Sequence, residues 1–129
     1  MTVASGPIED QMQHIRRVCP QALTRALSDG TTLVTIADVP LPAGWSQPTT
    51  AVNFVVPTGY PVAKPDCFYA DAELRLANGG MPQSSGPNVL PGTSESRLWF
   101  SWHIASWNPA TDSLLTYLRV IQRRLAEVR

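Results

Sequence analysis

Apolar positions follow a helical period near the start of the chain. Between residues 8 and 27 they fall into two groups, each with a spacing of three or four positions, which predicts a helical but broken stretch. The residues concerned are Ile8, Met12, Ile15, Leu23 and Leu27. Because proline cannot continue a helix, Pro20 is expected to end or bend the first turns at Val18–Cys19. Ser28-Asp29-Gly30 follows as a stop and turn signal.

The middle of the chain changes to the period of two that is typical of strands. Thr31–Val39 is rich in β-branched residues, Ala51–Val56 is a short apolar run between prolines, and Cys67–Leu76 alternates apolar with polar side chains. In Cys67–Leu76 the apolar face holds Phe68, Ala70, Ala72, Leu74 and Leu76, and the polar face holds Tyr69, Asp71, Glu73 and Arg75. Such alternation predicts one buried and one solvated face. Thr58–Asp66, which contains prolines and a glycine, is expected to form a loop.

The last part of the chain predicts a long irregular segment and then a helix. Asn78–Ser96 is rich in glycine, proline and serine and is too long for an ordinary hairpin turn. Leu98–Ile104 is expected to be a fourth strand or an extended segment. Ser113–Val128 predicts a helix with Thr111 or Asp112 as its N-cap. Its apolar stripe is Leu114, Leu118, Ile121, Leu125 and Val128, and its expected outer face carries Arg119, Arg123, Arg124 and Arg129.

The order of these elements predicts an α+β fold. An N-terminal helix, an antiparallel β-meander, a long irregular segment and a C-terminal helix packed on the sheet would bury one common core. The pattern shows no internal repeat, so residues 1–129 are expected to form one domain.

Composition narrows the classes of partner and location. The formal net charge of zero argues against a nucleic acid or an anionic membrane held mainly by charge. No apolar run has the length of a membrane span, and Met1–Pro7 lacks the features of a signal peptide, so a cytoplasmic location is expected. Cys19 and Cys67 show no metal-type spacing and are expected to be separate thiols.

The segment Trp99–Pro109 concentrates the polar chemistry of the chain. It holds three of the four tryptophans and one of the two histidines. Ser101 and His103 are two positions apart, so on an extended segment their side chains project to the same face. Trp99, Trp102 and Trp107 are expected to anchor the segment against the sheet and the last helix, although part of this cluster would also suit a partner interface. Trp45 is expected to lie in a satellite of the core.

Three short motifs, in this order, resemble the ubiquitin-conjugating enzyme family. Tyr60-Pro61, followed by Pro65 and Phe68, resembles the Tyr-Pro turn, further proline and aromatic strand residue of that family. Gly86-Pro87-Asn88-Val89 is similar to its His-Pro-Asn-Ile run with the histidine replaced. Trp107-Asn108-Pro109-Ala110 is similar to its Trp-Ser-Pro-Ala run, which also precedes a helix.

The resemblance extends from Thr31 to Leu125 and points to one branch of the family. The bacterial branch encoded beside ubiquitin-like proteins has a similar Pro-Asp-x-Phe and Ser-x-His…Trp arrangement. The resemblance implies a ubiquitin-conjugating-like fold and a role as transferase. The implied partners are a ubiquitin-like protein and an adenylating activating enzyme, with no metal and no organic cofactor. In this family the first helix meets the activating enzyme, so Arg16 and Arg17 are candidates for docking as well as for an ordinary solvated face.

The chain departs from the family at the catalytic position. The family's cysteine lies between the asparagine and the Trp-x-Pro motif, but residues 89–106 contain no cysteine. Cys67 precedes the motif, inside the meander. Thioester chemistry at the usual position is therefore impossible in this sequence, and a replaced cysteine would explain the absence.

Ser101 and His103 form the candidate catalytic pair. A neutral imidazole would accept the hydroxyl proton and activate Ser101 as an acyl acceptor, giving an oxyester in place of a thioester. Asn88 would donate a hydrogen bond to the developing oxyanion, as the family's asparagine is thought to do. The alternative is a structural histidine, a serine that fills space between tryptophans, and an asparagine that serves its turn.

The remaining polar residues have simpler structural explanations. Asp66 is expected to cap a turn and Asp112 to cap the last helix, with an orienting role towards His103 as the lesser alternative for Asp112. Cys67 is expected to be a small buried thiol rather than a reactive one. No role is assigned to Cys19, His14 is expected to be exposed on the first helix, and the alternative acceptors in the long segment are Ser84, Ser85, Ser94 and Ser96.

Two functions from different classes follow. In the first, the chain accepts a ubiquitin-like protein from an activating enzyme and passes it to a target. In the second, the same fold binds a ubiquitin-like protein without catalysis, as cysteine-less members of the superfamily do. A covalent adduct with the carrier would separate them. An unrelated α+β protein with a coincidental Trp-x-Pro motif is a third alternative.

Overall fold

The computed structural model describes residues 7–129, so the expected lack of a signal peptide at Met1–Pro7 falls almost wholly outside it. Along the chain, one helix precedes six strands and a second helix follows them. The elements are α1 (Pro7–Val18), β1 (Leu23–Ala26), β2 (Thr32–Pro40), β3 (Thr49–Val56), β4 (Phe68–Ala70), β5 (Ser85–Val89), β6 (Ser96–Phe100) and α2 (Leu114–Ala126).

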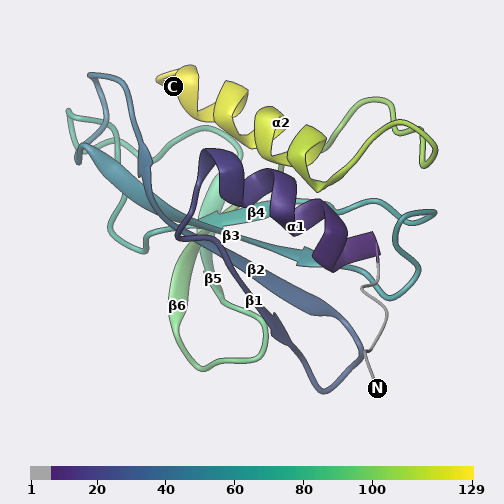
Figure 1. The fold of residues 1–129 in the computed structure, drawn as a ribbon. Coiled ribbons are helices and arrows are strands. Elements are labelled where there is room, and N and C mark those ends of the chain that lie inside the picture. The colour runs from purple at the N-terminus through teal and green to yellow at the C-terminus, as the bar shows by residue number, and fades with distance from the viewer. Residues whose placement is uncertain (1–6) are drawn as a thin grey trace.

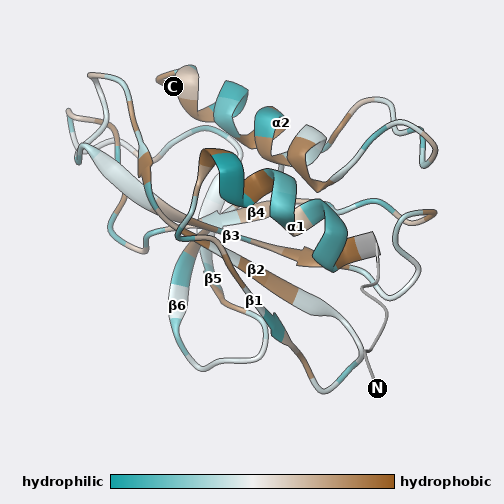
Figure 2. Ribbon diagram, viewed as in Figure 1, coloured by the Kyte–Doolittle hydropathy of each residue, from teal (hydrophilic) through white to brown (hydrophobic). Residues whose placement is uncertain are grey.

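The strands form one antiparallel sheet in the order β1-β2-β3-β4-β6-β5. Figure 1 shows α1 and α2 side by side on the same face of this sheet. In Figure 2 the strands through the middle of the sheet carry brown segments, and both helices alternate between brown and teal. This is the pattern expected of amphipathic helices that bury one face on a sheet. The α+β class, with one helix near each end of the chain, is confirmed.

The predicted helical stretch over residues 8–27 is correct only for its first part. α1 ends at Val18, before Pro20, and the chain from Leu23 to Ala26 forms strand β1 against β2. Leu23 is exposed on this strand, so its helical spacing to Leu27 does not reflect a buried helix face. The Leu27 N–H donates to Thr31 O over 2.9 Å and closes the hairpin at the predicted turn. Pairing with β2 therefore overrides the local period.

The predicted third strand, Cys67–Leu76, is much shorter than expected. Only Phe68–Ala70 pairs with neighbouring strands, although the more distant Leu74 is also buried. Asp71 redirects the chain, because its carboxylate accepts a hydrogen bond from Gln47 Nε2 over 2.8 Å and its carbonyl accepts one from the Leu74 N–H over 3.1 Å. These bonds favour a turn over a continued ladder.

The predicted irregular segment, Asn78–Ser96, contains strand β5, which forms a hairpin with β6. The turn between them is closed by the Leu90 N–H, which donates to Glu95 O over 2.9 Å. Gly92 lies in this turn at a φ of 76°, and an added Cβ would lie 2.6 Å from a Leu27 side-chain atom. β5 is an edge strand, where Pro87 is tolerated despite its missing N–H. Its proline and glycine content therefore hid a strand from the sequence analysis.

The core lies between the two helices and the sheet. Phe68 and Phe100, on the neighbouring strands β4 and β6, stack with ring centroids 4.7 Å apart. Trp45, expected in a satellite of the core, belongs to the main core and donates from Nε1 to Leu125 O over 2.9 Å. Burying the apolar side chains of both helices supplies most of the stability of such a fold.

Helix α2 was predicted over Ser113–Val128 but extends from Leu114 to Ala126. Ser113 is its N-cap, in a capping box with Thr116, whereas Asp112 accepts a hydrogen bond from the Asn108 N–H over 2.7 Å. Arg124 was expected on the outer face, but only 1% of its surface is exposed. Its guanidinium lies over the rings of Phe100 and Trp102 and donates to backbone carbonyls, including that of Gln83 over 2.9 Å. No helix in the described part of the chain is long and apolar enough to cross a membrane.

Candidate functional site

The candidate site lies where β4 begins and where the chain leaves β6. The Cys67 N–H donates to Trp102 O over 3.1 Å, which continues the pairing of the two segments beyond the β4–β6 ladder. Farther along, Lys64 Nζ donates to Ile104 O over 3.1 Å and Trp107 Nε1 donates to Pro61 O over 2.8 Å. The irregular segment 101–107 is thus held along its length by the loop that precedes β4.

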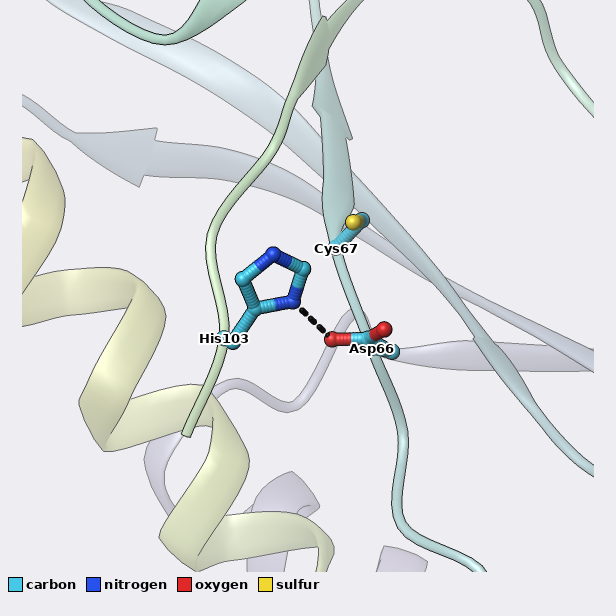
Figure 3. Close-up of side chains that lie close together, drawn as sticks. All are labelled: Asp66, Cys67 and His103. Carbon is cyan, nitrogen blue, oxygen red and sulfur yellow. Dashed lines mark hydrogen bonds and ion pairs between the residues drawn. The ribbon is translucent and has the colours of Figure 1, made fainter. Parts of the chain in front are cut away.

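His103 and Asp66 face each other across this junction. His103 Nδ1 is hydrogen-bonded to Asp66 Oδ1, and the side chains of the two residues are 54% and 52% exposed. Figure 3 shows the imidazole ring projecting from the segment after β6 towards the segment that carries Asp66 and Cys67. A carboxylate on Nδ1–H holds a neutral imidazole in the tautomer whose lone pair is on Nε2. The pair is therefore accessible to solvent and suited to accept a proton.

Cys67 completes a compact cluster with these two residues. The Cys67 sulfur, one His103 ring nitrogen and one Asp66 carboxylate oxygen all lie within 4.8 Å of one another. Cys67 is half-buried, whereas Cys19 belongs to the buried core, and both are free thiols as predicted. Burial raises the pKa of the Cys67 thiol, and the neighbouring Asp66 carboxylate raises it further. The resting state of Cys67 at neutral pH is therefore the thiol.

The backbone of Cys67 adopts a conformation that side chains other than glycine rarely allow. Its φ is 59°, in the left-handed region, which costs about 1–2 kcal/mol for a residue with a Cβ. Hydrogen bonds hold the residue on both sides. Its N–H donates to Trp102 O, and its carbonyl accepts the Tyr117 hydroxyl over 2.6 Å. Tyr117 is fully buried in α2, and burial raises the pKa of its hydroxyl, so it stays a donor.

A groove opens beside His103, between segment 102–106 and helix α2. We call it the α2 groove, and its volume is about 670 Å³. It is lined by Trp102, His103, Ile104, Ala105, Ser106, Asp112, Thr116, Val120, Arg123, Arg124 and Glu127. Its size falls in the range of ligand-binding clefts. His103 is thus the one member of the cluster that also lines the groove.

The structure brings together only part of the predicted catalytic set. His103 is in the cluster, but among residues 7–129 no hydrogen bond joins Ser101 or Asn88 to it. Ser101 is half-buried just after β6, and its N–H donates to Ser84 O over 2.8 Å. Asn88 is exposed on β5, where its side-chain oxygen accepts from the Val89 N–H over 2.8 Å. Neither the Ser101 acceptor nor the Asn88 oxyanion donor is tested by these contacts, and both stay predictions.

Sequence reasoning did not foresee the partners of His103. It assigned Asp66 to a turn cap and Cys67 to a buried thiol, yet both face the imidazole. The available signal was the Pro65-Asp66-Cys67 run, where the predicted loop meets the predicted strand Cys67–Leu76, with a histidine in another extended segment. His14 is exposed on α1, as predicted.

The same three residues also form a possible set of metal ligands. Thiolate, imidazole and carboxylate are all ligands that zinc accepts. The direct hydrogen bond between His103 and Asp66, however, uses one ligand atom from each residue. A carboxylate bonded to Nδ1 orients the imidazole, so this arrangement fits an oriented histidine better than a site in which all three residues hold an ion.

The comparisons with known proteins agree with this geometry at the level of the family. Residues 23–128 match the family model described as prokaryotic E2 family E. No curated protein and no solved structure matches the chain. The matched range includes the whole sheet, the His103–Asp66 pair and α2.

Proposed function

The chain belongs to the prokaryotic E2 family E, and on this premise we propose that it accepts a ubiquitin-like protein from an adenylating activating enzyme and passes it to a target. Membership in this family supports a role connected with ubiquitin-like conjugation. The six-stranded antiparallel sheet with two helices is compatible with an E2-like fold. In the proposed reaction, the acyl group at the carrier's C-terminus leaves the activating enzyme and forms a new acyl bond with an acceptor atom of this chain.

The observation that carries this proposal is the exposed His103–Asp66 pair. Acyl transfer to a hydroxyl or a thiol needs a base that removes the acceptor's proton. His103 has its Nδ1 bonded to Asp66, which leaves Nε2 available for that proton. Because about half of each side chain is exposed, an incoming acyl group can reach the pair.

The α2 groove offers a place for the end of the carrier. His103 lines the groove, together with the exposed Arg123 of α2. An extended peptide tail in this groove would present its carbonyl carbon near His103. Arg123 would then pair with a carboxylate or a carbonyl of the carrier. The exposed Arg17 of α1 stays a candidate for docking of the activating enzyme.

The acceptor atom can be a hydroxyl or a thiol without changing the proposed function. Ser101, with Asn88 as the oxyanion donor, is the acceptor that the sequence predicted. Its product would be an oxyester, which hydroxide cleaves and added thiols leave intact. A thioester on a cysteine would be cleaved by both reagents.

The function is tested by loading. The protein is incubated with ATP and with the activating enzyme and ubiquitin-like protein encoded by neighbouring genes, and the mass of any covalent adduct is measured. We expect an adduct with the wild-type chain and at least a tenfold slower reaction with His103→Ala. His14→Ala is the matched control, because His14 is exposed on α1 away from the cluster. Equal loading by both histidine variants would contradict the role of His103.

A non-catalytic binding module is the second candidate function. It is favoured by the lack of a cysteine in residues 89–106, where the ubiquitin-conjugating family has its nucleophile. In that case the carrier binds without an adduct, and binding is insensitive to His103→Ala. Calorimetry measures binding of the same carrier, and the loading reaction measures the adduct. A binding module binds the carrier and gives no adduct, whereas a conjugating protein gives one.

A further inference from the structure

Cys67 lies against both residues of the exposed His103–Asp66 pair. We propose that Cys67 is the acyl acceptor of this site, that His103 is the base which takes the thiol proton, and that Asp66 is a positioning residue for His103. The inference rests on the proposed function and deepens it, because it names the atom that would carry the ubiquitin-like protein. It also moves the nucleophile from Ser101, just after β6, to the start of β4.

The first support is the arrangement of the three side chains. A nucleophile, a base near it and a third group that orients the base are the recurring parts of covalent catalysis. Here the thiol, the imidazole and the carboxylate offer atoms within 4.8 Å of one another. Among the described residues, no hydrogen bond joins the Cys67 sulfur to His103, as is common when no substrate is bound. Rotation about the single Cα–Cβ bond of Cys67 changes the separation between sulfur and nitrogen.

The second support is the backbone of Cys67. Its positive φ occurs directly before β4, where the next residue, Phe68, is buried in the core. The Tyr117 hydroxyl and the Trp102 carbonyl hold this conformation on the two sides of the residue. Strained residues that several contacts hold in place gather at functional sites. A thiol needed only to fill the core would not require this conformation, as buried Cys19 illustrates.

The third support is the need for a base. Among the described residues, the groups that act on the thiol are Asp66, His103, the hydroxyls of Tyr69 and Tyr117, and hydrogen bonds from Trp99 and Trp102, and none of these groups is a permanent cation. Burial raises the pKa of the thiol, and together with the Asp66 carboxylate it outweighs the hydrogen bonds from Trp102 and Trp99 that lower this pKa, so the protonated thiol is favoured. Transfer of the proton to His103 creates an imidazolium beside Asp66, which stabilises the new positive charge. The thiolate then has a neighbouring cation at the moment of attack.

The step balances without an oxidant or a reductant. Cys67 Sγ attacks the carbonyl carbon of a carrier thioester, and its proton moves to His103 Nε2. A new carbon–sulfur bond forms on Cys67, and the carbon–sulfur bond to the donor breaks. The donor thiolate takes the proton from the imidazolium and leaves as a thiol.

The experiment uses a chemical acyl donor, so it needs no protein partner. The full chain is incubated at pH 7.5 with a short peptide that carries a C-terminal thioester of 2-mercaptoethanesulfonate. Mass spectrometry measures the rate of peptide transfer and maps the acylated residue. We expect transfer to Cys67, loss of the product with Cys67→Ala, and cleavage of the product by added thiol.

Matched variants separate the site from the rest of the chain. Cys19→Ala is expected to retain the wild-type rate, because Cys19 lies in the core away from the cluster. His103→Ala should slow the transfer by about 100-fold, while His14→Ala leaves it unchanged. Circular dichroism tests whether each variant is folded. If Cys67→Ala is not folded, Cys67→Ser is used in its place. Acylation of Ser101, acylation that persists in the folded Cys67 variant, or no acylation of the wild-type chain overturns the inference.

The role of Asp66 is tested by coupling. Asp66→Ala should slow the transfer by about tenfold, and Asp66→Asn, which keeps an acceptor oxygen for Nδ1–H, should recover part of that loss. If Asp66 acts through His103, the double variant Asp66→Ala/His103→Ala is no slower than His103→Ala alone. Independent, multiplying losses would show that Asp66 does not act through His103. Asp10→Asn, in the first turn of α1, is the control for removing an exposed carboxylate.

Failure of this inference differs from failure of the proposed function. If the carrier forms an adduct that Cys67→Ala retains, the function stands and Cys67 is not the acceptor. If the peptide thioester acylates Cys67 but the carrier and activating enzyme give no adduct, the thiol chemistry stands and the proposed function fails.

Discussion

The two cysteines occupy regions that use the same side chain in opposite ways. Cys19 follows α1, is 8% exposed, and packs in the core between the helices and the sheet. Its N–H donates to Ile15 O over 2.7 Å, as in a regular helix end. Cys67 precedes β4, is half-buried, has a positive φ, and lies against a hydrogen-bonded histidine and aspartate.

Burial alone does not distinguish the two thiols. Burial raises the pKa of both thiols, and the exposed Arg119 only partly offsets the rise at Cys19. What distinguishes Cys67 is access to solvent and a neighbouring base. The comparison is therefore tested best by measurements that read accessibility, packing and backbone support separately.

Accessibility should give the largest contrast. At pH 7.5 we expect iodoacetamide to alkylate Cys67 about 100-fold faster than Cys19 in the folded protein, because Cys19 reacts only after local opening of the structure. Peptide mapping after timed quenching measures both rates in one sample. In concentrated guanidinium chloride the two rates should become similar. Similar rates in the native protein would show that the environment of Cys19 opens readily and would remove the contrast.

Packing should give the next largest contrast. Cys19→Ser places a hydroxyl in the core without a hydrogen-bond partner, so the free energy of unfolding should fall by about 2 kcal/mol. Cys67→Ser, at a site with solvent access and polar neighbours, should lower it by less than about 0.5 kcal/mol. Urea denaturation measures both changes. A larger loss at Cys67 would mean that this thiol serves packing after all.

The sequence predicted those elements whose patterns are local. Strands β2 and β3 and both helices follow from β-branched runs and from apolar stripes within each segment. β1 and β5 did not follow, because they are edge strands defined by pairing with β2 and β6. Edge strands need little apolar side-chain burial, so their sequences carry a weak signal.

The site was predictable only in its parts. His103 was singled out from its place among the tryptophans, but its hydrogen-bond partner Asp66 lies 37 positions earlier in the chain. Pairing of β4 with β6 brings the two residues together, and the short strand β4 was itself mispredicted in extent. The sequence pattern does not predict the register of β4 against β6. The positive φ of Cys67 is likewise fixed by contacts with Trp102 and Tyr117, which come from other elements.

Backbone support should give the smallest but most specific contrast. Tyr117→Phe removes the hydroxyl that donates to Cys67 O and keeps the buried ring, which packs edge-on against Phe54. The free energy of unfolding should fall by about 1 kcal/mol, the usual net value of one hydrogen bond. Without this contact the backbone of Cys67 is freer to leave the left-handed region, so transfer from the peptide thioester should slow by about fivefold.

The control for this prediction is Tyr69→Phe, on β4 two residues beyond Cys67. Tyr69 is half-buried, and among the described residues its hydroxyl makes no hydrogen bond with Cys67. We expect a change in unfolding free energy below about 0.5 kcal/mol and an unchanged transfer rate. Among residues 7–129, no side-chain hydroxyl donates a hydrogen bond to the Cys19 carbonyl. The alkylation rate of Cys19 should therefore not respond specifically to Tyr117→Phe. If Cys19 and Cys67 changed together, the variant would be loosening the whole core, and the hydroxyl would have no special role in holding the thiol at the start of β4.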